Sequence, residues 1–141
     1  MSTLRVLIAD DSPEFIQSAA RFLSRVPHLE IVGCVLTGCD AVDLARHLKP
    51  DLVLIDLVMP EMNGLQATAK LKALVPTPQV IVITLNDIDA YRAAAHAVGA
   101  DGFVSKAELG KQLLPTIESL FAGVFAQSNL IELARQENLE I

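Results

Sequence analysis

The sequence predicts an α/β fold in which helices cover both faces of a parallel sheet of five strands. Short apolar runs alternate along the chain with segments whose apolar residues recur at helical spacing. Some runs are unbroken, as in Leu52–Ile55 and Val80–Ile83, and unbroken runs are typical of parallel strands buried on both faces. Strands that alternate with helices in this way are joined by right-handed crossovers.

The expected strands are short and lie close to turn or polar residues. The first begins near Leu4 and runs through Val6–Ala9. The others are expected at residues 29–35, 52–56, 80–83 and 102–105. The last of these follows a tight turn that begins at Gly99.

The first helix has a signal at each end. Ser12 is expected as its N-cap and Pro13 as its first residue. A stripe of apolar residues continues to about Val26, where Pro27 ends it. The remaining helices are expected at residues 40–48 and 65–74, then after a cap at Asn86 or Asp87, and finally from near Glu108 in register to Val124.

The composition indicates a single globular domain. The chain has 141 residues, 52% of them hydrophobic, and a mean hydropathy of +0.43, which excludes a disordered chain. The apolar runs are too short to cross a membrane, and the first residues lack a signal peptide, so we expect a cytoplasmic location. The net charge of −6, with only 11 scattered Lys and Arg, argues against direct nucleic-acid binding.

The two cysteines, Cys34 and Cys39, have four residues between them, in the pattern C-x4-C. No second pair accompanies them, so neither a zinc site nor a disulfide framework is indicated. We predict that both thiols are buried, as free cysteines usually are.

Polar residues follow four of the expected strands. Asp10 and Asp11 follow the first strand, Asp56 ends the third, Thr84 follows the fourth and Lys106 follows the fifth. In an open α/β sheet the carboxyl ends of the strands form the edge where ligands bind. Alone, each residue has an ordinary explanation, such as a solvated turn or a helix cap. Together they predict a site with three carboxylates, a hydroxyl and an ammonium group.

This pattern resembles the receiver domain of bacterial two-component response regulators, over about residues 4–122. The resemblance implies a flavodoxin-like sheet of order 2-1-3-4-5, with a receiver domain at 1–122 and a C-terminal linker or extra helix at 123–141. It rests on Asp10 and Asp11, on Asp56 with Met59, Pro60 and Gly64, on Thr84, and on the stretch GADGFVSK that ends at Lys106.

The resemblance also implies the chemistry of the site. Asp56 would accept a phosphoryl group from a phosphohistidine on a sensor histidine kinase or a phosphotransfer protein. Mg²⁺ would be bound directly by Asp11, Asp56 and the backbone carbonyl of Val58, and largely through water by Asp10, because clustered carboxylates favour a hard cation. At ~4–5 Å such carboxylates repel by roughly 3–4 kcal/mol at an effective dielectric of 20. Lys106 and Thr84 would bind the phosphoryl oxygens. Such a domain would catalyse only its own phosphorylation and dephosphorylation.

Further positions bear on switching and on output. Phe103 stands where the family has an aromatic residue that swings inward when the Thr84 position moves, although a plain core role is the alternative. It lacks the hydroxyl that would hold a tyrosine outward. Leu85 stands where the family usually has a small residue, and Val58 and Asn86 are positions expected to modulate the phosphoryl lifetime. Ala107 replaces a common proline, as in members with a helix-turn-helix (LuxR/NarL-type) output, which implies transcriptional control. A homodimer is also expected as a possible partner arrangement.

Other functions compete with this one. A pseudo-receiver, acting as an interaction module without phosphorylation, is supported only by Leu85. A phosphohydrolase of the haloacid-dehalogenase kind needs an acid two residues after the nucleophile, and Val58 occupies that position. Flavin or nucleotide binding would need a glycine-rich phosphate loop, which the sequence lacks.

Overall fold

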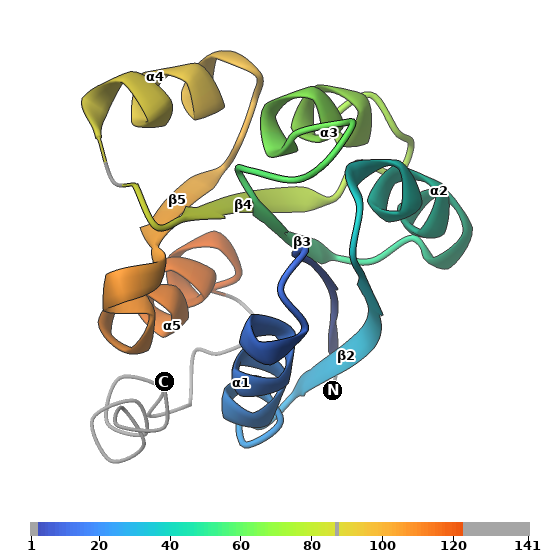
Figure 1. Ribbon diagram of the computed structural model, residues 1–141. Coiled ribbons are helices and arrows are strands. Elements are labelled where there is room, and N and C mark those ends of the chain that lie inside the picture. The colour runs from blue at the N-terminus through green and yellow to red at the C-terminus, as the bar shows by residue number, and fades with distance from the viewer. Residues whose placement is uncertain (1–2, 87, 123–141) are drawn as a thin grey trace.

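The computed structural model describes residues 3–86 and 88–122, which form a five-stranded sheet with helices on both sides (Figure 1). All strand pairs are parallel and their order is β2-β1-β3-β4-β5, which confirms the predicted topology. The elements are β1 (Leu4–Ala9), α1 (Pro13–Leu23), β2 (Leu29–Val35), α2 (Gly38–Leu48), β3 (Leu52–Asp56), α3 (Gly64–Leu71), β4 (Gln79–Thr84), α4 (Asp89–Ala97), β5 (Gly102–Ser105), a 3₁₀ turn η1 (Lys106–Glu108) and α5 (Leu109–Leu120).

The sheet separates two apolar cores. Helices α1 and α5 cover one face, and α2, α3 and α4 cover the other (Figure 1). Successive residues of a strand point to opposite faces. On β3, Leu54 therefore packs with α1 and α5, whereas Val53 and Ile55 pack on the other side. Because both faces are covered, the central strands need no polar residues until they reach the sheet edge.

The signals at the start of the helices are mostly those expected. Ser12 caps α1, where its hydroxyl accepts a hydrogen bond from Phe15 N at 3.2 Å, and Pro13 is the first helical residue. Helix α2 begins two residues earlier than predicted, because Thr37 caps it. Helix α3 begins with a reciprocal capping box between Asn63 and Gln66.

Two helices end about three residues before the predicted positions. Helix α1 ends at Leu23, although Val26 is still buried, and α3 ends at Leu71. In both cases the chain continues through tighter turns, as in the bonds from Val26 N to Leu23 O and from Leu74 N to Leu71 O. Hydrogen bonds between residues three apart are typical of 3₁₀ turns, which often follow the last turn of an α-helix. The spacing of apolar residues does not distinguish such a turn from α-helix.

The predicted cap of α4 is wrong for Asn86, and Asp87 lies outside the described residues. The helix begins at Asp89 after Ile88, which makes no side-chain capping bond and is half exposed. Asn86 instead belongs to the turn after β4, where its amide donates a hydrogen bond to Thr84 Oγ1 at 3.0 Å. Val124 and the predicted linker at 123–141 also lie outside the described residues.

The prediction of buried thiols is wrong as well. Cys34 and Cys39 are both exposed. Cys34 lies on β2, the edge strand of the sheet, which is less fully covered than the strands inside it. Cys39 lies in the first turn of α2. Within the described part of the chain, no helix has the length and apolar character needed to span a membrane.

Candidate functional site

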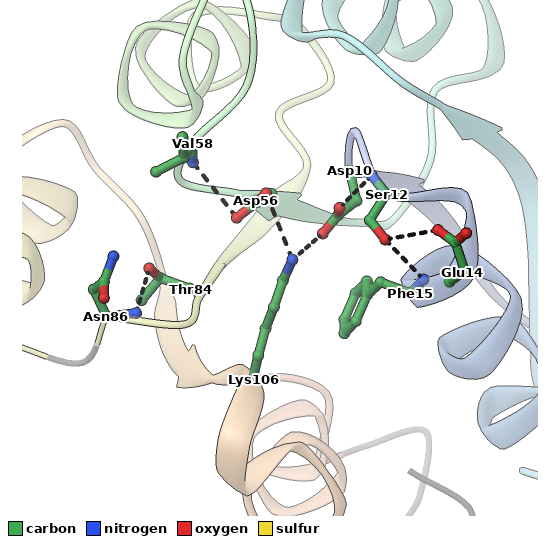
Figure 2. Close-up of polar contacts among 9 residues, drawn as sticks. All are labelled: Asp10, Ser12, Glu14, Phe15, Asp56, Val58, Thr84, Asn86 and Lys106. Carbon is green, nitrogen blue, oxygen red and sulfur yellow. Dashed lines mark hydrogen bonds and ion pairs between the residues drawn. The ribbon is translucent and has the colours of Figure 1, made fainter.

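The carboxyl edge of the sheet brings together the polar residues that follow the strands (Figure 2). Asp10 is 1% exposed, Asp56 7% and Thr84 1%, so three polar groups are buried at one end of an apolar core. Lys106, in η1, has a side chain that is 11% exposed. Asp11 is exposed and lies at the rim. Buried polar groups require partners, and most of these residues provide partners for each other.

Three carboxylates form the acidic part of the site. One oxygen from each of Asp10, Asp11 and Asp56 lies within 4.8 Å of the others. Asp10 is oriented by the start of α1, because its Oδ1 accepts a hydrogen bond from Ser12 N at 2.8 Å. Asp56 Oδ1 accepts a hydrogen bond from Val58 N at 3.4 Å. These bonds fix two of the three carboxylates while leaving other oxygens directed to the cluster.

Lys106 supplies positive charge to this cluster. Its Nζ lies 2.7 Å from Asp10 Oδ2 and 3.5 Å from Asp56 Oδ2 (Figure 2). The same Nζ lies 4.3 Å from the centroid of the Phe15 ring, which comes from the first turn of α1. The ammonium group is therefore surrounded by two carboxylates and an aromatic face.

The raised pKa of Asp56 indicates that the positive charge of Lys106 does not offset the effects of burial and of the neighbouring carboxylates. Burial, and after it the charge of the neighbouring Asp10 carboxylate, raise the pKa of Asp56 from 3.8 to about 6. Lys106 and the hydrogen bond from Val58 N act against this rise in pKa without cancelling it. An additional cation would favour the ionised form of Asp56.

The donor set fits Mg²⁺. All of the side-chain donors in the cluster are carboxylate oxygens, the ligands that this hard cation prefers. Asp11 lies exposed at the rim, where a cation could keep some of its water ligands. The side chain of Val58 is 59% exposed, and its amide is already engaged with Asp56.

Gly64 fixes the loop that follows Asp56. Its amide donates a hydrogen bond to Leu57 O at 2.9 Å, and Leu57 N donates to Ile83 O at 2.9 Å. A Cβ atom at Gly64 would lie 2.2 Å from Asp56 O and 2.9 Å from Leu57 Cα, which are backbone atoms with little room to move. The close approach of the two segments therefore requires glycine, and it holds the backbone of Asp56 in place.

The residues after β4 surround Thr84. Because Thr84 Oγ1 accepts its bond from Asn86 N, the hydroxyl hydrogen stays available as a donor. The next side chain, Leu85, is 72% exposed, so it is not packed into the core.

Phe103 lies on β5 next to α4. It is half-buried against the core on the α2, α3 and α4 side, and the Arg92 guanidinium lies 4.7 Å from its ring centroid. A cavity of about 180 Å³ adjoins both side chains. A cationic group of α4 thus covers the ring that we expected to lack a polar anchor.

Sequence reasoning missed the contacts of Phe15 and Arg92. Each residue was visible only as a member of a helix. For Phe15 a signal existed, because a helix capped by Ser12 places its first turn beside the end of β1. For Arg92 the sequence offers no signal, since the contact depends on how α4 packs on β5.

Comparisons with known proteins identify a family match and several relatives of this chain. Residues 6–118 match the family described as the response regulator receiver domain. The chain is 35% identical over 120 residues to the response regulator GacA of Pseudomonas aeruginosa, which covers 85% of this chain and 56% of GacA. It is 43% identical over 101 residues to a protein-glutamate methylesterase/protein-glutamine glutaminase of Myxococcus xanthus, covering 67% of this chain and 29% of that protein.

A solved structure is also similar. A two-component response regulator of the LuxR family from Aurantimonas superposes with a TM-score of 0.81 at 28% identity, covering 98% of this chain and 99% of that chain. By contrast, the chain spans only about half or less of the two curated relatives. The similarity to those relatives is therefore similarity to one part of them.

Proposed function

The chain belongs to the response regulator receiver family, and we propose that Asp56 accepts a phosphoryl group from a sensor histidine kinase or a phosphotransfer protein. The observation that carries this proposal is the position of Asp56: a buried carboxylate at the sheet edge, 3.5 Å from Lys106 and clustered with Asp10 and Asp11. We place the reaction in the cytoplasm, where response regulators generally act.

The proposed reaction is a phosphoryl transfer between two residues. A carboxylate oxygen of Asp56 forms a bond to phosphorus while the bond from phosphorus to the donor histidine nitrogen breaks, and the imidazole leaves with the electron pair. The Lys106 ammonium, already at the cluster, attracts the transferred oxygens. The Thr84 hydroxyl donates its free hydrogen to one of those oxygens after transfer.

Asp10, Asp11, Asp56 and the backbone carbonyl of Val58 would hold the Mg²⁺ that this reaction needs. When bound, the ion neutralises the negative charge that builds up between carboxylates and phosphoryl oxygens. The raised pKa of Asp56 supports this assignment, because it reflects burial first and the Asp10 carboxylate second, and Lys106 does not offset the two together.

Phosphorylation would act as a switch for a separate output. Thr84 would pull its loop toward the phosphoryl group, and Phe103, with Arg92 over its ring, would respond on the α4 side. The similar structures include a response regulator of the LuxR family, which supports the proposal that the output is transcriptional. Homodimer formation is a further part of this proposal. The domain would have no activity on a separate substrate. Val58 and Asn86 would set the lifetime of the phosphoryl group.

Intact-mass measurement after incubation with acetyl phosphate and Mg²⁺ tests the proposal. We expect the wild-type chain to gain one phosphoryl group, and we expect no gain without Mg²⁺ or in Asp56→Asn. Asp51→Asn is a matched control, because Asp51 lies at the opposite end of β3 and should leave the adduct intact. No adduct in the wild type, with no binding of beryllofluoride, would instead support a pseudo-receiver.

A further inference from the structure

The Lys106 ammonium has an aromatic neighbour whose role no part of the proposed reaction explains. We propose that Phe15 is a positioning residue for Lys106, and that its ring holds the ammonium group against the carboxylate cluster by a cation–π contact. This inference rests on the proposed function, because it assigns Phe15 a role in the reaction at Asp56.

The contact has the geometry of a cation–π interaction. Lys106 Nζ lies 4.3 Å from the ring centroid of Phe15, well inside the roughly 6 Å within which such attraction acts. Phe15 is half-buried and the Lys106 side chain is 11% exposed, so water screens the contact little. Figure 2 shows the ring on the α1 side of the Lys106 side chain.

The ring is held in place by the same loop that orients Asp10. Ser12 N donates a hydrogen bond to Asp10 Oδ1, and Ser12 Oγ accepts one from Phe15 N. The carboxylate that pairs with Lys106 and the ring that covers it are thus fixed through one residue. A change in the start of α1 would move both of them together.

The ring adds something that the carboxylates do not provide. A lysine side chain is long and has many rotamers, so ion pairs alone leave its end free to move toward solvent. An aromatic face attracts the ammonium group without accepting a proton or adding negative charge. It also replaces water on one side of the group, which strengthens the attraction between Lys106 and incoming phosphoryl oxygens.

Three substitutions in the full chain separate positioning from packing. Phe15→Leu keeps an apolar side chain and removes the aromatic face, whereas Phe15→Tyr retains the face. Phe22→Leu is the matched control, because Phe22 is a buried residue of the same helix and the same core. Two quantities are measured: the initial rate of mass gain with acetyl phosphate and saturating Mg²⁺, and the NMR shifts of the Lys106 ε-methylene protons in the unphosphorylated chain.

We expect Phe15→Leu to slow phosphorylation roughly 3- to 10-fold and to abolish the ring-current shift of the lysine protons. Phe15→Tyr should restore both quantities to within about twofold of the wild type. Phe22→Leu should lower the melting temperature but leave the rate and the lysine shift unchanged.

Several outcomes would overturn the inference. A lysine shift that is the same in Phe15→Leu and wild type would show that the ring does not lie over the ammonium group. A lost shift with an unchanged rate would show that the contact does not position Lys106 for the reaction. Failure of the wild type to gain a phosphoryl group would overturn the proposed function instead, and the shifts would still decide whether the contact exists.

Discussion

Lys106 makes its short ion pair with Asp10, at 2.7 Å, although Asp56 is the residue that we propose to be phosphorylated. Asp56 Oδ2 is 3.5 Å from the same ammonium nitrogen. The closer partner of the lysine is thus the more deeply buried carboxylate, and the pKa of Asp56 stays raised although Lys106 lies 3.5 Å away. A nucleophile in that state gains from any additional cation or bound electrophile.

The first prediction concerns the stability of the chain as a function of pH. The pKa of Asp56 is about 6 in the folded chain and 3.8 as an ordinary side chain, so the folded state binds this proton more tightly. The resulting stability is fully present below pH 3.8 and is lost as the pH rises through about 6. At pH 7 without Mg²⁺, Asp56→Asn should therefore be more stable than wild type by about 3 kcal/mol.

Urea denaturation at a series of pH values measures this difference. The advantage of Asp56→Asn should shrink to nearly zero at about pH 3, below the ordinary pKa of 3.8, where the wild-type carboxyl group is largely protonated in both states. An advantage that does not change with pH would mean that the carboxylate charge is not its cause.

The second prediction concerns the exposed carboxylate of the cluster. Asp11→Asn should weaken Mg²⁺ binding roughly 10- to 100-fold, since one charged oxygen donor is replaced by a neutral one. Because Asp11 is exposed, the free energy of unfolding without Mg²⁺ should change by less than about 0.5 kcal/mol. Calorimetric titration with Mg²⁺ measures the affinity, and Asp40→Asn, an exposed acid on α2, serves as the control.

The third prediction concerns the glycine that packs against Asp56. Gly64→Ala should destabilise the chain by about 2–3 kcal/mol, because the new Cβ atom meets backbone atoms that cannot move independently. Gly33→Ala is the matched comparison. Its Cβ atom would meet the side-chain ends of Leu44 and Leu7, which can adjust, so we expect a cost below about 1 kcal/mol. Equal costs in thermal denaturation would contradict this explanation.

The fourth prediction concerns the bulky residue after Thr84. Leu85→Ala should change the free energy of unfolding by less than about 0.5 kcal/mol, because the side chain is 72% exposed. If Leu85 limits the approach of donors, the same substitution should raise the rate of phosphorylation by acetyl phosphate. Val75→Ala, at an exposed apolar residue far from the site in sequence, should leave that rate unchanged. A slower rate in Leu85→Ala would show that the leucine assists the reaction.

The strands and the residues at their ends could be predicted because one sequence signal determines both. An unbroken run such as Leu52–Ile55 is tolerated only where the strand is covered on both faces, and Asp56 then has to emerge at the edge. The grouping of Asp10, Asp56 and Lys106 follows from parallel pairing, which brings all of the carboxyl ends to one side. No knowledge of side-chain packing was needed for that step.

The predictions that were wrong, and the contacts that were missed, concern features that depend on side-chain packing or on local hydrogen bonds. Asn86 is a good capping residue by type, but it lies in the turn after β4, where its backbone N–H donates to Thr84 Oγ1, and the helix begins only at Asp89. The burial of the Cys34 thiol was predicted from the usual behaviour of free cysteines, but β2 is an edge strand and leaves that residue exposed, as the predicted strand order already implies. By contrast, the contact between the Phe15 ring and Lys106 depends on how α1 packs beside η1, which the sequence alone does not specify.

Helix α4 differs from its neighbours in how firmly it is held. Ala95 is the only residue buried within its described span, and no side chain caps its start, whereas α1 buries Ala19, Phe22 and Leu23 behind the Ser12 cap. Local opening costs least where few apolar groups are buried and terminal amides lack partners. The amides of α4 should therefore exchange with solvent faster than those of α1. A small displacement at Thr84 can consequently shift α4, the next helix along the chain, at a low cost in free energy, because few buried contacts hold that helix in place.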